Sequence, residues 1–137
     1  MSNNVSNIYR ETLNPGNIRY VETYTWIGQC GQFKGFTKFI DQIYGIRALV
    51  LLLRNYLRKG VDTLELIIGR YAPNTENNTL EYIKYVREYL ADRGFFPLVF
   101  KYDTPAFMYL VMAICKYETG YELTHYELNY VLQRFDL

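Results

Sequence analysis

The chain has 137 residues, half of them hydrophobic, which fits one soluble domain with its own core. It carries 15 Lys and Arg against 14 Asp and Glu, and this net charge of +1 argues against a nucleic-acid-binding protein that works through a strong basic field. A single His and two Cys without metal-motif spacing argue against a zinc site. We therefore expect no metal, no cofactor and no nucleic-acid partner.

The first forty residues are expected to contain little helix. Residues 1–13 are interpreted as a polar, loosely ordered N-terminal arm. Residues 14–17, Asn-Pro-Gly-Asn, predict a tight turn, because Pro presets the second position and Gly accepts a positive φ at the third. Residues 18–40 combine β-favouring side chains with several glycines, which predicts a small β region.

The remainder of the chain shows the apolar period, capping residues and terminal glycines of helices. Five helices are predicted, over about residues 41–60, 63–73, 78–94, 104–120 and from 124 onwards. Residues 95–100 are interpreted as an apolar linker or a short strand. The expected fold is mainly α within the α+β class, with one helical domain over residues 14–137.

The chain shows no sign of export or of a membrane span. Its polar start lacks the apolar core of a Sec signal peptide. The most apolar run, residues 48–53, is much shorter than a transmembrane helix. We therefore expect a protein without a Sec signal peptide and without a membrane-spanning helix.

Five short motifs occur in order between residues 14 and 87. They are Asn14-Pro15-Gly16-Asn17-Ile18-Arg19, Trp26-Ile27-Gly28-Gln29, Phe36-Thr37-Lys38-Phe39, Tyr44-Gly45-Ile46-Arg47-Ala48-Leu49 and the stretch from Tyr71 to Tyr82. In this order they resemble small phage and prophage virion proteins. That family is similar in turn to the lysozyme-like superfamily, in particular glucosaminidases and lytic transglycosylases. The resemblance implies a lysozyme-like fold, a peptidoglycan glycan strand as substrate, and other virion proteins as further partners. It also implies a location in the virion, or in the bacterial cytoplasm with delivery to the cell wall.

Cleavage of a glycosidic bond requires a carboxylic acid that protonates the leaving oxygen. A lytic transglycosylase needs no second carboxylate, because a hydroxyl of the sugar is the nucleophile. The resemblance assigns this role first to Glu76, which matches the Glu-Asn-x-Thr part of the family pattern. Glu11, the only acid before Asn14, is the other catalytic candidate. The alternative for Glu76 is structural, in the turn before the next helix.

Six residues are candidates for binding the substrate. They are Asn14, Asn17, Arg19, Trp26, Tyr71 and Asn77. Amide and guanidinium groups suit acetamido or carboxylate groups, and aromatic rings suit sugar faces. The alternatives are a turn with a surface ion pair for the polar residues, and a place in the core for Trp26.

Three functions remain open from the sequence. The first is a peptidoglycan-directed, lysozyme-like enzyme, either a glycosidase or a lytic transglycosylase. The second is a virion structural or binding module without catalysis, and the third is a small helical protein that binds a protein partner.

Overall fold

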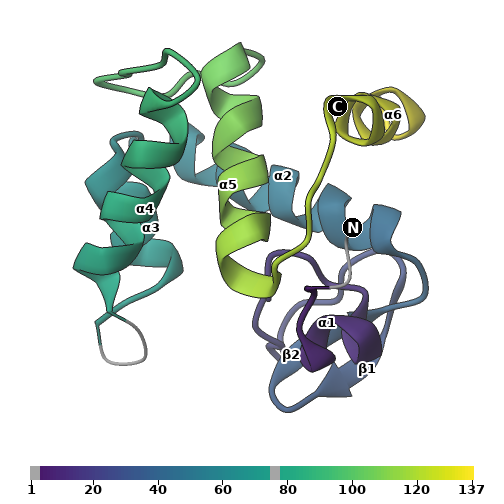
Figure 1. Cartoon of the computed structure of the whole chain (residues 1–137). Coiled ribbons are helices and arrows are strands. Elements are labelled where there is room, and N and C mark those ends of the chain that lie inside the picture. The colour runs from purple at the N-terminus through teal and green to yellow at the C-terminus, as the bar shows by residue number, and fades with distance from the viewer. Residues whose placement is uncertain (1–3, 75–77) are drawn as a thin grey trace. The chain divides into compact units, whose positions relative to one another are not determined.

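The computed structural model describes residues 4–74 and 78–137 of the chain (Figure 1). These residues form six helices and one two-stranded antiparallel sheet. The elements are α1 (Asn7–Thr12), β1 (Gln29–Phe33), β2 (Phe36–Phe39), α2 (Gln42–Arg58), α3 (Leu64–Tyr71), α4 (Thr79–Ala91), α5 (Pro105–Thr119) and α6 (His125–Arg134). The predicted mainly helical α+β class is confirmed, with one helix more than expected.

The chain divides into two compact units. The first unit comprises Met1–Leu51 and Ile114–Leu137, and the second comprises Leu52–Ala113. Helices α2 and α5 each contribute residues to both units. No described helix has the length and apolar character that crossing a membrane requires.

The additional helix is α1, which lies within the segment that was expected to be loosely ordered. Ser6 caps it by accepting a hydrogen bond from the Tyr9 N–H at 3.1 Å. Tyr9 and Thr12, one helical turn apart, are both buried. The Ser6 N–H also donates to the Thr119 carbonyl at 2.8 Å, so the start of the chain is held against the end of α5. The expectation of a loose segment is wrong for residues 7–12, because a six-residue helix shows too little periodicity to be recognised.

The predicted β region between residues 18 and 40 is confirmed as a β-hairpin. Phe33 of β1 pairs with Phe36 of β2, so the loop has two residues, Lys34 and Gly35. Both have positive φ, 52° and 86°, which a two-residue type I′ turn requires. A bridge between Arg19 and Phe36 places the chain after the first turn against β2.

Three of the predicted helices, α3, α4 and α6, begin at a side-chain N-cap, as expected. The side chains of Thr63, Asn78 and Thr124 accept hydrogen bonds from the N–H groups of the third residue after each of them, at 3.1 to 3.2 Å. Three glycines after helices adopt positive φ, namely Gly60, Gly94 and Gly120. Local chemistry therefore sets these boundaries.

Each unit has apolar side chains that are almost completely buried. In the first unit they include Phe39, Ile46, Leu49 and Leu128, and in the second Leu53, Ile67, Ile68, Tyr82 and Leu90. Residues 95–100 contain no strand. Of these six residues, Phe100 is buried, and its N–H donates to the Asp62 carbonyl at 2.8 Å.

Candidate functional site

The turn at residues 14–19 is organised around the side chain of Asn14, which is fully buried. Its Nδ2 donates to the carbonyl oxygens of Ile18 and Thr37 at 3.0 and 2.9 Å, and its Oδ1 accepts from the Ile18 N–H at 3.0 Å. A Cβ at Gly45 would lie 2.7 Å from the Leu13 carbonyl oxygen, so only glycine lets α2 approach this backbone so closely. Asn14 therefore joins the turn to β2 through backbone groups.

Two other candidates from the same turn lie closer to the surface. Asn17 has a φ of 52°, and its Nδ2 donates to the carbonyl and to the Oε1 of Glu118, each at 3.2 Å. Arg19 is exposed and its guanidinium carbon lies 4.7 Å from the centre of the Phe36 ring. The guanidinium thus stacks on an aromatic face while remaining accessible.

Trp26 lies in the loop between this turn and β1, and it is not a fully buried core residue. It is half-buried, and its ring meets the ring of Tyr24 edge-on at 4.6 Å between centroids. The backbone N–H of Trp26 donates to Oε1 of Gln29 at 3.1 Å, which fixes the loop backbone. Tyr24 and Ile27 are exposed beside it. The loop therefore presents aromatic and apolar side chains on the surface of the first unit.

The two catalytic candidates differ in what the structure says of them. Glu11 is exposed near the end of α1. Glu76 and Asn77 lie outside the described residues. Tyr71, the last residue of α3, is half-buried.

The described residues on either side of Glu76 hold the two ends of its loop together. Thr79 donates from Oγ1 to the Ala72 carbonyl at 2.5 Å, and its N–H donates to Oδ1 of Asn74 at 3.1 Å. Asn78 caps α4 through the Glu81 N–H. The loop therefore starts and ends at fixed points.

The structure also brings together four polar side chains that the sequence analysis did not group. Glu127 of α6 accepts hydrogen bonds from Nε2 of Gln42 and from the Tyr121 hydroxyl, the latter at 2.5 Å. The Tyr9 hydroxyl donates to Oε1 of Gln42, and the rings of Tyr9 and Tyr121 stack at 5.1 Å. We call these four residues the Glu127 cluster. It joins α1, α2 and α6 within the first unit.

Burial changes the protonation of the phenols in the Glu127 cluster. It raises the pKa of Tyr9 well above its ordinary value, and the negative charge of Glu127 adds to this effect. The pKa of Tyr121 is raised first by burial and then by its hydrogen bond to Glu127. Both phenols therefore stay protonated and act as hydrogen-bond donors, which suits a structural network.

The two cysteines are both free thiols. Cys115 is buried, which raises its pKa, and Cys30 is exposed. Among residues 4–74 and 78–137, no group of three or more His, Cys, Asp and Glu side chains could hold a metal ion.

Part of the chain is similar to a phage protein. It is 44% identical over 52 residues to Protein P5 of Pseudoalteromonas phage PM2. These residues are 37% of this chain and 32% of the phage protein, so the chain matches about a third of that relative's length. No family model matches the chain. The similarity connects the chain with phage proteins, and the lysozyme-like resemblance stays a prediction.

Proposed function

We propose that this chain is a phage protein directed at peptidoglycan, and that it cleaves the glycan strand with Glu76 as proton donor. The similarity to a phage protein supports the phage origin of the chain. The observation that carries the catalytic assignment is the capping of α4 by residues other than Glu76.

The structural alternative for Glu76 is that its carboxylate accepts the N–H groups at the start of α4. Two of these N–H groups already have other side-chain acceptors. The Thr79 N–H donates to Asn74 and the Glu81 N–H donates to Asn78, each at 3.1 Å. Neither bond requires an acid at position 76. Loops held at both ends by rigid elements are common positions for catalytic groups.

In the proposed reaction the Glu76 carboxyl gives its proton to the glycosidic oxygen, and the bond from that oxygen to the anomeric carbon breaks. A hydroxyl of the same sugar then bonds to the anomeric carbon and returns a proton to the Glu76 carboxylate. One carboxyl group thus serves as acid and then as base, which agrees with the general requirement for a proton donor in glycosidic cleavage.

A zymogram on purified peptidoglycan tests this proposal. We expect clearing by the parent protein, and loss of a general acid typically lowers the rate by a factor of about 10² to 10⁴. Glu76→Gln should therefore abolish visible clearing. Glu88→Gln, which changes an exposed carboxylate on α4, is the matched control and should clear like the parent. Glu11→Gln tests the other candidate acid. Absence of clearing by the parent between acid and neutral pH would refute the enzymatic proposal.

A second candidate function is binding of the glycan without cleavage. The observation that favours it is the half-buried Trp26 beside the exposed Tyr24 in the loop before β1. Such rings can stack on sugar faces without any catalytic acid. We expect Trp26→Ala to reduce co-sedimentation with insoluble peptidoglycan, whereas Tyr126→Ala, at a ring that is 84% exposed on α6, should not. Equal retention of both variants would contradict this binding surface.

A further inference from the structure

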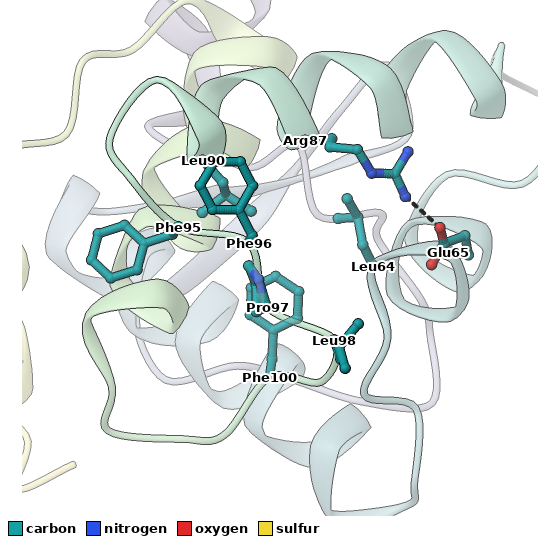
Figure 2. Close-up of a pocket in the computed structure, with 9 residues that line it drawn as sticks. All are labelled: Leu64, Glu65, Arg87, Leu90, Phe95, Phe96, Pro97, Leu98 and Phe100. Carbon is teal, nitrogen blue, oxygen red and sulfur yellow. Dashed lines mark hydrogen bonds and ion pairs between the residues drawn. The ribbon is translucent and has the colours of Figure 1, made fainter.

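The second unit contains a cavity that neither proposed function uses. Its volume is about 270 Å³, and its lining includes the buried side chains of Leu64, Leu90 and Phe100 (Figure 2). The segment of residues 95–100, between α4 and α5, forms much of its lining. The cavity therefore has an apolar floor within a single unit.

Two of the side chains that line the cavity are large, apolar and exposed to solvent. Phe96 is 77% exposed and Leu98 is 90% exposed. Pro97 lies between them and restricts the backbone. Exposed apolar groups that gather at a cavity mark interaction surfaces, because burying them in a partner releases about 25 cal/mol for each Å². This surface thus carries both protruding apolar groups and a hollow that could receive such groups.

The charges at the cavity indicate which partner fits. Arg87 and Glu65 form an ion pair on its wall, and their side chains are 55% and 61% exposed (Figure 2). A strongly basic or acidic partner would be attracted by one of these charges and repelled by the other. A second copy of the same surface offers the opposite charge to each of them. The net charge of +1 adds little repulsion between copies.

We propose that this surface is the interface of a homodimer, in which Phe96 and Leu98 of one copy cover the cavity of the other. A two-fold arrangement requires one surface that is complementary to itself, because each contact then occurs twice. The exposed apolar pair, the cavity and the two opposite charges meet this requirement. In the dimer, Arg87 of each copy faces Glu65 of the other.

Sedimentation velocity over about 1 to 500 µM tests the proposal. We expect the parent protein to show a concentration-dependent dimer. Leu98→Asp should weaken dimerisation at least tenfold, and its 90% exposure means that folding should be unaffected, which circular dichroism checks. Ile40→Asp, at an apolar residue of the first unit that is 62% exposed, is the matched control and should dimerise like the parent. A parent that stays monomeric throughout, or a dimer insensitive to Leu98→Asp, would overturn the proposal.

Charge reversal distinguishes contacts between copies from the ion pair within each copy. Glu65→Arg and Arg87→Glu both destroy the internal pair, and each should weaken its own homodimer through like charges. An equimolar mixture of the two variants restores opposite charges between copies only. We therefore expect the mixture to dimerise more strongly than either variant alone. A mixture that associates no better than its components would contradict the two-fold arrangement.

Discussion

Replacing Asn14 should destabilise the protein strongly, because its buried amide serves three backbone groups at once. Asn14→Ala leaves the Ile18 N–H and the Thr37 carbonyl oxygen without these partners, whereas the Ile18 carbonyl oxygen still accepts from the Thr37 N–H at 2.9 Å. A buried polar group without a partner costs about 1 to 3 kcal/mol. Relaxation and entry of water into the vacated space reduce the sum, so we expect the free energy of unfolding to fall by about 3 to 5 kcal/mol.

Urea unfolding followed by circular dichroism measures this loss, and the melting temperature should fall by roughly 9 to 20 °C. Asn14→Asp has the same shape but turns a donor into an acceptor that faces two carbonyl oxygens. It should therefore be at least as destabilising as Asn14→Ala. Asn129→Ala, at an exposed amide on α6, is the control and should change stability by less than about 0.5 kcal/mol. A loss below about 1 kcal/mol for Asn14→Ala would refute the reasoning.

Two further predictions concern packing and pH. Gly45→Ala should lower the free energy of unfolding by about 1 to 3 kcal/mol, because the new Cβ clashes with the Leu13 carbonyl oxygen. Gly69→Ala in α3 should instead raise the free energy of unfolding by about 0.5 to 1 kcal/mol, because a Cβ at this position meets nothing within 4 Å and alanine favours the helix. Equal effects in urea unfolding would contradict this difference. Because the pKa of Tyr121 is raised on folding, its contribution to stability is complete below the ordinary tyrosine pKa of about 10 and is lost as pH rises further. Tyr121→Phe should therefore flatten the decline of the unfolding free energy above about pH 10, and Tyr126→Phe is the control.

The helix boundaries were predictable because they depend on residues close together in the sequence. The caps at Thr63, Asn78 and Thr124 each act on an N–H group three residues later. The β region was expected only in outline. Its hairpin turn, Lys34-Gly35, contains a non-glycine residue at positive φ, and the sequence analysis did not identify this pair as the turn.

The Glu127 cluster was not predictable in the same way. Gln42 is 79 residues from Tyr121 and 85 residues from Glu127 along the chain. No local pattern connects residues at such separations. Glu127 also lies three residues after Thr124, which is the spacing of a capping box. Its N–H is indeed capped by Thr124, but its carboxylate bonds to Gln42 and Tyr121.

The structure separates binding candidates that the sequence treated alike. The Asn14 amide already has backbone partners for both its oxygen and its nitrogen, so a ligand that used this amide would have to displace bonds that hold the turn to β2. Arg19 and Trp26 present accessible surface while stacking on an aromatic neighbour. Substitution of Asn14 would therefore reduce binding through loss of structure, whereas Arg19→Ala and Trp26→Ala change the surface itself. Binding measured with folded variants at these two positions is consequently the decisive test of glycan recognition by the first unit.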